Sequence, residues 1–230
     1  MSIAKVNLAV IALQGAFSEH IFMLQRLPLL VASIFEVRSS ADFERVKDSI
    51  DGIVLPGGES TTMSIILERE TGLRDGLKQW IQDGKPIWGT CAGLIMLSDT
   101  ITSTKQGGQT KLGGLRTTVR RNAFGRQTDS FEIELSIPAI ESYGPNPTTG
   151  KVTLPGVFIR APVIEAIHDD GVQVVARLHG RQGREGEIVA VQQGNILGSS
   201  FHPELTGDVR FHQLFVDICI KSKVASKLGA

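Results

Sequence analysis

The chain has 230 residues, a length that suits one α/β domain with a substantial core, and its 24 basic residues balance 24 acidic ones. A formal net charge of zero gives no long-range attraction to nucleic acid or to an anionic membrane, so we expect neither as a partner. The two cysteines, Cys91 and Cys219, cannot form a disulfide framework, and no Cys/His spacing resembles a zinc site, so we expect no metal and no other cofactor.

The N-terminal half alternates apolar runs of strand length with amphipathic stretches of helical length. It begins without a secretory signal, and no apolar run is long enough for a bilayer, which predicts a cytoplasmic protein. The pattern predicts strands at 6–13, 34–37, 52–55 and 87–88, and helices at 17–24, 39–49 and 73–81. This order predicts right-handed βαβ units, and hence an α/β fold of three layers, α/β/α, around a mostly parallel central sheet. Functional loops are then expected at the carboxyl ends of the strands.

The C-terminal half is less regular. Strands are expected at 131–135, 156–162, 173–177, 187–192 and 195–201, the last two as a hairpin. Loops rich in glycine, proline or polar residues are expected at 102–114, 143–155 and 179–187. An apolar stripe at 211–219 predicts a final helix in which Cys219 is a packed, inert thiol. Neither an internal repeat nor a linker is visible, so a single domain, 1–230, is expected.

A turn that presents a nucleophile is predicted at Gly89-Thr-Cys-Ala-Gly93, between the strand at 87–88 and the apolar run 94–97. Glycines two residues to either side of a reactive residue are typical of a nucleophile elbow, where strand turns into helix so sharply that no flanking side chain fits. The helix N-terminus there would favour a Cys91 thiolate. A small buried cysteine would give the same pattern, so the hypothesis requires a base and an oxyanion site elsewhere.

Of the five histidines, His202 has the surroundings that a catalytic base needs. It follows an apolar strand, and Glu204 stands two residues on, across Pro203. Proline favours extended backbone for the residue before it, and in extended backbone residues i and i+2 point the same way, so Glu204 could orient the His202 ring. A turn with two polar residues is the alternative. The remaining histidines are expected to be solvated or structural: His20, His168, His179 and His212.

An oxyanion site is predicted at Pro56-Gly-Gly-Glu-Ser60, which follows the strand at 52–55. Glycines there let a backbone N–H point into the cleft, so Gly58 would supply one donor and Ala92, just after the nucleophile, the other. A tight connection without function would also use two glycines.

Together these motifs resemble the class I glutamine amidotransferases, whose triad is Cys-His-Glu, and the resemblance implies their flavodoxin-like arrangement of layers. More narrowly, further blocks are similar to the family of glutaminase subunits of pyridoxal 5'-phosphate synthase (the Pdx2, PdxT or SNO family). The blocks follow the family's order along nearly the whole chain: Leu13-Gln-Gly-Ala16 with Glu19-His20, then 56–63, 121–127 with 129–132, 156–162 and 200–206.

The resemblance implies a role for each matching residue. Cys91 would attack the side-chain amide of L-glutamine to give a γ-glutamyl thioester and ammonia. His202 would protonate the leaving nitrogen and then activate water, with Glu204 holding its ring. The substrate contacts would be Gly58, Glu59, Ser60, Arg121, Ile159 and Arg160. A guanidinium suits the α-carboxylate of glutamine, and the sequence leaves open which arginine provides it.

The resemblance also implies a partner, a (β/α)8-barrel synthase of the Pdx1 type that uses the ammonia to build pyridoxal phosphate. Ammonia released into water would mostly be protonated and lose its nucleophilicity, so a partner makes chemical sense. In the family the glutaminase is nearly idle until docked, and our hypothesis is that the flexible Gly57–Gly58 peptide completes the oxyanion hole only on docking. Loops at 102–111, 143–155 and 179–187 are longer than in the compact family pattern and could alter partner contacts.

Other classes remain open from the sequence. A γ-glutamyl peptidase or another synthase's glutaminase shares the elbow and the His-Pro-Glu segment, but the blocks at 121–127 and 156–162 argue against both. An α/β-hydrolase usually places its acid before the histidine, and a chaperone-like cysteine enzyme places a histidine where Ala92 stands. A catalytically silent regulatory subunit would not need the intact set of Cys91, His202 and Glu204.

Overall fold

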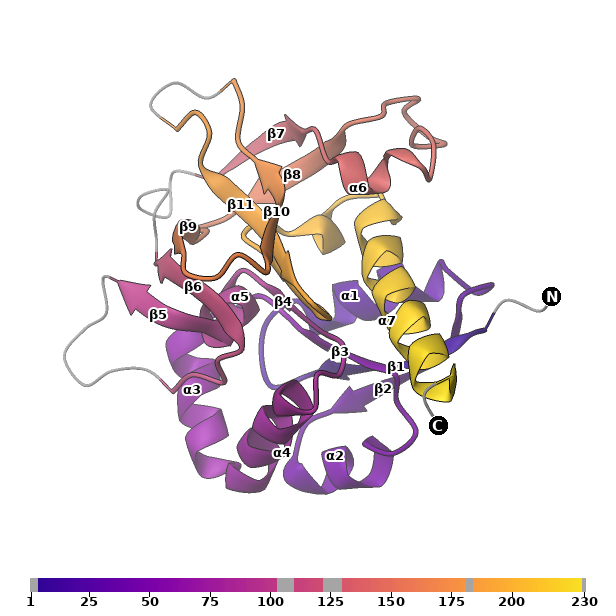
Figure 1. Cartoon of the computed structure of the whole chain (residues 1–230), viewed down its shortest axis with the longest axis vertical. Coiled ribbons are helices and arrows are strands. Elements are labelled where there is room, and N and C mark those ends of the chain that lie inside the picture. Colours follow the sequence, from indigo (N-terminus) through magenta and orange to yellow (C-terminus); the bar gives the residue numbers. More distant parts are fainter. Residues whose placement is uncertain (1–3, 103–109, 122–129, 181–183, 229–230) are drawn as a thin grey trace.

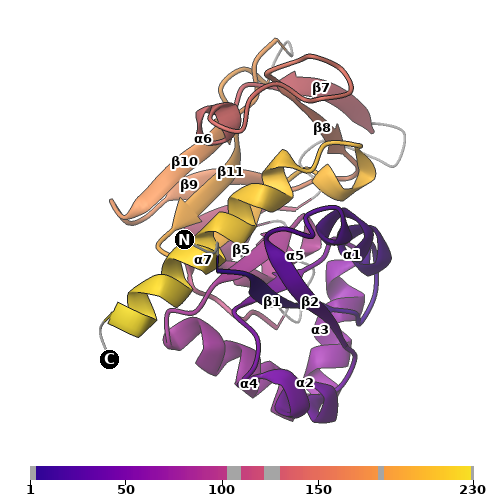
Figure 2. The same ribbon diagram turned by 90° about the vertical axis from the view of Figure 1, so that its right-hand side faces the viewer.

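The computed structural model describes residues 4–102, 110–121, 130–180 and 184–228, and it places a central sheet between two sets of helices (Figures 1 and 2). In the first half the elements are β1 (Val6–Ile11), α1 (Phe17–Gln25), β2 (Val31–Val37), α2 (Ser40–Val46), β3 (Gly52–Leu55), α3 (Ser60–Arg69), α4 (Thr71–Gln82), β4 (Ile87–Thr90) and α5 (Ala92–Leu97). They are followed by β5 (Ser98–Thr102), β6 (Leu115–Arg120), β7 (Phe131–Leu135), α6 (Pro138–Glu141), β8 (Leu154–Phe158), β9 (Val163–Ile167), β10 (Val172–Arg177), β11 (Ile188–Gln193), β12 (Ile196–Ser199), the 3-10 turn η1 (Pro203–Leu205) and α7 (Arg210–Leu228).

The strand order of the large sheet is β2-β1-β3-β4-β12-β11-β9-β6-β5, with β10 beside β11. Neighbours from β2 through β12 are parallel, β12, β11, β9 and β6 pair antiparallel, and β5 is parallel to β6. A separate antiparallel pair, β7–β8, lies with α6 at the opposite end of the molecule from α2 and α4 (Figures 1 and 2). The expected α/β class with a mostly parallel central sheet and flanking helices is confirmed.

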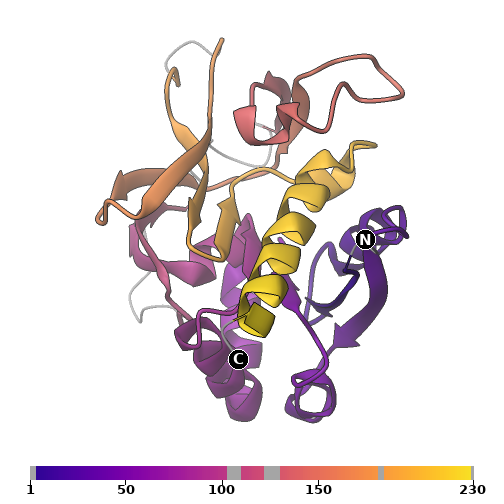
Figure 3. The ribbon, with the colours of Figure 1, turned by 45° about the vertical axis from the view of Figure 1, so that its right-hand side comes forward.

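Two hydrophobic cores form because alternate residues of a strand face opposite sides of the sheet. In β1, Leu8 and Val10 belong to the core shared with α1 and α7, whereas Ala9 and Ile11 belong to the core shared with α2, α3, α4 and α5. Helix α7 runs across the first of these faces (Figure 3). Strands covered on both sides are uniformly apolar, which is why the first half of the sequence predicts its strands well.

Five elements are missed by the sequence patterns: α3, β5, β6, α6 and β9. Helix α3 begins inside the glycine-rich stretch expected to be a loop, because the Glu59 carboxylate accepts the N–H groups of Thr61 and Thr62 and so caps it. Strands β5 and β6 are partly exposed and lack a continuous apolar run.

The strand expected at 156–162 is wrong in its bounds. Strand β8 ends at Phe158, and the chain turns at Arg160, whose φ of 46° is outside the strand region, before β9 begins at Val163. Residues 103–109, 122–129 and 181–183 lie outside the described residues, and with them most of the block 121–127, Asp129 and parts of the loops expected at 102–114 and 179–187. None of the described helices has the length and apolar character that crossing a membrane requires.

Candidate active site

Four neighbouring parallel strands, β1, β3, β4 and β12, end at the same edge of the sheet. Their register pairs Leu55 with Gly89 and Thr90 with Ser199, so the ends of β3, β4 and β12 are level. The segments that follow these strands carry the residues singled out from the sequence: Gln14 and Gly15, the Gly57–Gly58 pair, Cys91, and His202. This is the edge of an open α/β sheet where ligands bind.

The predicted elbow at Cys91 is present, and its two glycines are required by backbone contacts. A Cβ added to Gly93 would lie 2.0 Å from the Leu55 carbonyl oxygen, and one added to Gly89 would lie 2.5 Å from the Gly93 carbonyl carbon. Between them Cys91 has φ 47° and ψ −99°, a conformation rare for any residue with a side chain, and it is the N-cap of α5. Its N–H donates to the Ser199 carbonyl at 2.8 Å, which fixes the strained turn to β12.

His202 lies between a sulfur and a carboxylate. Its Nδ1 is 2.7 Å from Glu204 Oε1, and the Cys91 sulfur is close enough to raise the pKa of the ring. The backbone N–H of His202 donates to the Val157 carbonyl at 2.8 Å, so β8 holds the backbone that carries the ring. The prediction that Glu204 reaches His202 is met, but not through an extended segment: Pro203–Leu205 is a 3-10 turn, which brings the carboxylate back to the imidazole.

The electrostatics of this cluster favour a charged ring beside a charged carboxylate. Burial alone lowers the pKa of His202, but the Cys91 sulfur and the Glu204 carboxylate raise it well above its ordinary value of 6.5. Burial alone raises the pKa of Glu204, and its interactions with His20 and His202 bring it below its ordinary value. A protonated imidazole held between sulfur and carboxylate is what a cysteine nucleophile with a general acid requires.

The Gly57–Gly58 peptide lies directly against this cluster. A Cβ on Gly57 would be 2.5 Å from His202 Cε1 and 3.2 Å from Cys91 Cβ, so no side chain fits there. The Gly57 carbonyl accepts the Ala16 N–H at 3.2 Å, and a Cβ on Gly15 would overlap that carbonyl at 1.8 Å. Because a trans peptide places its C=O and N–H on opposite sides, the bond from Ala16 also sets the direction of the next N–H, that of Gly58.

Gln14 holds the same loop from β1. Its Oε1 accepts the Glu59 N–H at 2.7 Å, and its side chain amide covers Gly58, where a Cβ would lie 2.4 Å from Oε1. The loop after β3 is therefore tied to the loop after β1 at two consecutive points, the Gly57 carbonyl and the Glu59 N–H.

A cavity of about 280 Å³ opens over Cys91 and His202. All six predicted substrate-contact residues line it: Gly58, Glu59, Ser60, Arg121, Ile159 and Arg160. Ala92 and Glu204 are buried behind the wall, with 1% and 5% of their surface exposed. Within the described part of the chain, no cluster of histidine, cysteine and carboxylate side chains has the arrangement of a metal site.

Glu59 and Arg121 form one side of the cavity as a pair. Glu59 Oε1 is 3.6 Å from Arg121 Nη2, and the same arginine donates to Thr61 Oγ1 at 3.3 Å. Desolvation raises the pKa of Glu59, but the hydrogen bonds from Thr62 and Thr61 outweigh it and lower this pKa to about 2. The Glu59 carboxylate is therefore ionised and committed to the cap of α3, while the Arg121 guanidinium is held facing the cavity.

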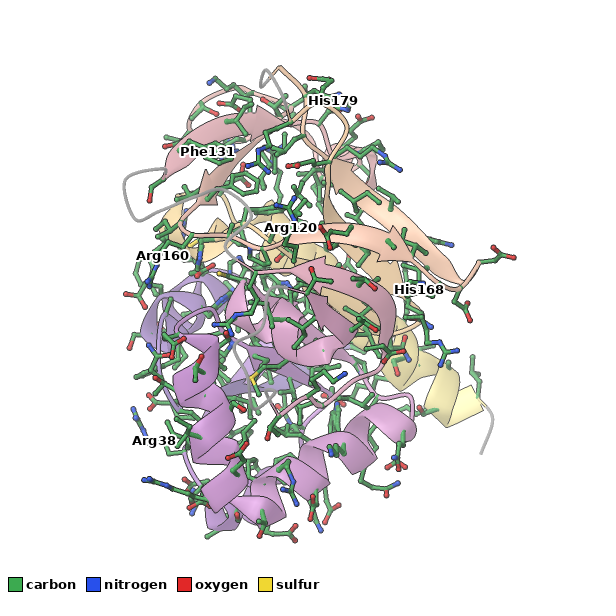
Figure 4. All side chains as sticks on the ribbon, turned by 90° about the vertical axis from the view of Figure 1, so that its left-hand side faces the viewer. Arg38, Arg120, Phe131, Arg160, His168 and His179 are labelled. Atoms are coloured by element: carbon green, nitrogen blue, oxygen red, sulfur yellow. The ribbon has the colours of Figure 1, made fainter. Side chains whose placement is uncertain are left out.

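Arg160 is exposed at the rim of the cavity, two residues after the end of β8 (Figure 4). The φ of Arg160 is positive, so its backbone no longer has the strand conformation of β8. Backbone strain of this kind in non-glycine residues is concentrated at functional sites. His168 and His179 lie on other parts of the surface (Figure 4), bonded to Thr118 and to Glu185, as the sequence predicts for solvated histidines.

Sequence reasoning places Gln14 at the active edge but does not give its bond to the Glu59 N–H, and it misses that His20 and His212 form a fully buried pair behind Glu204. A signal for His20 was available, because it shares the apolar face of α1 with Met23 and Leu24. Which groups meet it there depends on α7 and η1, nearly two hundred residues away in the sequence, and no local pattern reports that.

Comparisons with known proteins agree on one family. A family model described as the SNO glutamine amidotransferase family matches residues 10–221. The chain is 45% identical over 219 residues to the pyridoxal 5'-phosphate synthase subunit PdxT of Kineococcus radiotolerans, covering 95% of this chain and 97% of that one. The protein of the same name from Herpetosiphon aurantiacus is 41% identical over 213 residues, covering 93% and 100%.

Solved structures show the same fold. A crystal structure of a glutamine amidotransferase is 38% identical and superposes with a TM-score of 0.73, covering 92% of this chain and 98% of the other. A glutamine amidotransferase from Thermotoga maritima, 16% identical, superposes with a TM-score of 0.54 over 98% of this chain and 88% of its own.

Proposed function

The chain belongs to the SNO glutamine amidotransferase family, and on that basis we propose that it hydrolyses L-glutamine to L-glutamate and ammonia and supplies the ammonia to a synthase subunit that forms pyridoxal 5'-phosphate. The observation that carries the proposal is the meeting of Cys91 and His202 at one cavity, with Glu204 behind the His202 ring at an Nδ1–Oε1 distance of 2.7 Å. The whole chain, 1–230, acts in this proposal as one glutaminase domain in the cytoplasm.

The reaction begins at Cys91. Its sulfur attacks the side-chain carbonyl carbon of glutamine, and the N–H groups of Gly58 and Ala92 stabilise the oxyanion that forms. The first N–H groups of a helix have no partner within the helix, which suits Ala92 at the start of α5 to this role. His202 Nε2–H protonates the amide nitrogen, the C–N bond breaks, and ammonia leaves a γ-glutamyl thioester.

Water completes the cycle. His202, now neutral, takes a proton from a water molecule that attacks the thioester carbon, and the second oxyanion collapses to release glutamate and the Cys91 sulfur. Glu204 holds the Nδ1–H of the ring throughout, so Nε2 faces the reacting atoms. The sum is glutamine plus water to glutamate plus ammonia.

The cavity suits the amino-acid end of glutamine. The guanidinium groups of Arg121 and Arg160 provide bidentate donors for the α-carboxylate, and Glu59, Ser60 and the Ile159 backbone line the place for the α-ammonium. Glu59 already pairs with Arg121 and caps the start of α3. We therefore assign it two roles: it orients Arg121, and it contacts the substrate.

The partner in this proposal is a (β/α)8-barrel synthase that docks over the cavity and receives ammonia before it is protonated. The Gly57–Gly58 peptide is the element proposed to respond to docking, because glycines permit a peptide rotation that other residues resist. Its bond from Ala16 would be the contact exchanged.

The test is ammonia and glutamate release from L-glutamine by the purified chain, alone and with a purified pyridoxal 5'-phosphate synthase subunit. We expect equimolar products, faster with the partner, and none from Cys91→Ala. Cys219→Ala is the matched control: Cys219 is fully buried in α7, burial raises its pKa well above the ordinary value, and activity should persist. No ammonia from the folded wild-type chain in either condition would refute the enzyme and indicate a silent regulatory subunit.

A further inference from the structure

Two histidines that the proposed reaction does not use lie behind the triad. His20, on α1, and His212, on α7, are both fully buried. His20 Nε2 is 3.4 Å from Glu204 Oε2 and 3.2 Å from Thr90 Oγ1, while His20 Nδ1 is 3.1 Å from His212 Nε2. Neither histidine lines the cavity. The chain of contacts runs from α7 through α1 to the carboxylate that holds His202.

The protons of this chain can be assigned from its two ends. Glu204 Oε2 is buried, has no hydrogen-bond partner among the described residues and lies 3.4 Å from His20 Nε2, so a proton on Nε2, between this carboxylate oxygen and Thr90 Oγ1, is the favoured state. His20 Nδ1 is then a bare acceptor, and His212 Nε2–H donates to it. His212 Nδ1, for which the described residues offer no partner, is left without a proton.

Placing the proton of His20 on Nδ1 instead is less favourable both at Glu204 and at His212. A proton on His20 Nδ1 would leave the lone pair of Nε2 facing the carboxylate, and it would put an unpaired N–H on the buried Nδ1 of His212. An unsatisfied buried donor and a lone pair against a negative charge both cost free energy. In the favoured assignment His212 Nε2–H donates to His20 Nδ1, and the His20 Nε2–H lies between Thr90 Oγ1 at 3.2 Å and Glu204 Oε2 at 3.4 Å.

We propose that His20, with its proton fixed by His212, is a positioning residue that holds the second carboxylate oxygen of Glu204 and thereby sets the orientation and basicity of His202. The inference rests on the proposed function, and it extends the Cys-His-Glu set by two residues. Glu204 then has one imidazole on each oxygen, at 2.7 Å on the His202 side and 3.4 Å on the His20 side.

The surroundings keep both supporting histidines neutral and rigid. Burial lowers the pKa of His20, with Glu204 and Glu19 opposing and His202 reinforcing the shift, and burial lowers that of His212 further, with His20 and Arg26 reinforcing it. Trp88 packs edge-on against both rings, with centroids 5.1 Å from His20 and 4.9 Å from His212. A neutral donor on Glu204 stabilises the carboxylate without competing with His202 for charge.

The test compares His20→Phe with His20→Gln by two readings, the kinetics of glutamine hydrolysis with the synthase present and the titration of His202 by 15N NMR of the free chain. In His20→Phe, kcat should fall about tenfold or more, KM should stay unchanged, and the pKa of His202 should rise further above 6.5, because a carboxylate that loses a donor attracts the His202 proton more strongly. His20→Gln keeps an N–H near the Nε2 position and should recover part of both changes. The NMR spectrum of wild type should show His20 and His212 as neutral Nε2–H tautomers.

The control is Phe215→Leu, which disturbs packing at the same place, since Phe215 contacts Trp88 from α7, but removes no nitrogen. It should lower the melting temperature and leave the pKa of His202 unchanged. A folded His20→Phe with wild-type kcat and wild-type His202 pKa would overturn the proposal, as would the Nδ1–H tautomer for His20. If His20→Phe does not fold, His212→Phe is judged by the same readings. The NMR readings need no glutaminase activity, so they separate failure of this inference from failure of the proposed reaction.

Discussion

Gly57→Ala should disable the site without unfolding the chain. The added Cβ would lie 2.5 Å from His202 Cε1, and ordinary contact begins at 3.4 Å, so the ring must move by the difference, 0.9 Å. Displacement of a catalytic group by ~1 Å can cost ~100-fold in rate, which corresponds to about 2.7 kcal/mol in the activation free energy. The backbone itself tolerates alanine, because the φ of Gly57 is outside the positive region. Removing the freedom of a glycine from the unfolded chain stabilises by about 0.4–1 kcal/mol and offsets part of the contact strain.

The assay is kcat for glutamine hydrolysis with the synthase present, together with thermal unfolding of the same preparation. We expect about a 100-fold loss of kcat and a melting temperature within a few degrees of wild type. Gly207→Ala is the matched control, because a Cβ there has nothing within 4 Å and the φ is again permissive. A Gly57→Ala protein with kcat within threefold of wild type would show that His202 does not sit where the reaction needs it.

Substitutions at four further residues test other parts of the structure. Arg121→Ala and Arg160→Ala should each raise the KM for glutamine, and unchanged kinetics would count against a role of these arginines in binding it. Arg160→Gly should be more stable to urea than Arg160→Ala by about 1 kcal/mol, because glycine suits a φ of 46°. Glu59→Ala should lower the free energy of unfolding by about 1 kcal/mol at neutral pH through loss of the cap. The pKa of Glu59 falls from 4.5 to about 2 on folding, so the stabilisation by its ionised carboxylate is lost as the pH falls from 4.5 to about 2. The difference in unfolding free energy between Glu59→Ala and wild type should therefore shrink over this range. A difference that stays constant with pH would contradict the cap. Arg210→Ala should cost about 3 kcal/mol in urea unfolding, since it leaves the buried Asp208 carboxylate without its cationic partner, and a loss under about 0.5 kcal/mol would be incompatible with that pair.

Local rules predict the active edge of the sheet well. The strand before Cys91, the two glycines of the elbow and the Gly57–Gly58 turn are marked by the local sequence pattern, although the contacts that require Gly93, Gly57 and Gly58 come from Leu55, His202 and Gln14. The placement of Gly15 beside Gly57 needed one further rule, that parallel strands end at the same edge.

What the sequence could not predict depends on contacts between distant segments. From Pro203 alone, the residues after His202 are expected to be extended, but they form a 3-10 turn. This turn brings Glu204 back to the His202 ring, at a position beside His20 of α1. Likewise His20 and His212 are 192 positions apart, so their contact exists only once α1 and α7 cover the same face of the sheet. The expectation that these two histidines are solvated or structural therefore does not say what they contact: both are fully buried, and they contact each other.

The strain at Cys91 is sustained because the same strands that build the site also restrain it. A residue in so rare a conformation costs on the order of 1–3 kcal/mol and persists only where its neighbours fix it. Here β12 accepts its N–H through Ser199, and β3 blocks relaxation of the following turn through the Leu55 carbonyl against Gly93. The two glycines that crowd the nucleophile thus differ in kind: Gly93 meets a backbone carbonyl that cannot yield, whereas Gly57 meets the side chain of His202, which can. The elbow is consequently fixed by backbone contacts alone, whereas the position of the His202 ring also depends on side-chain packing against the Gly57 loop.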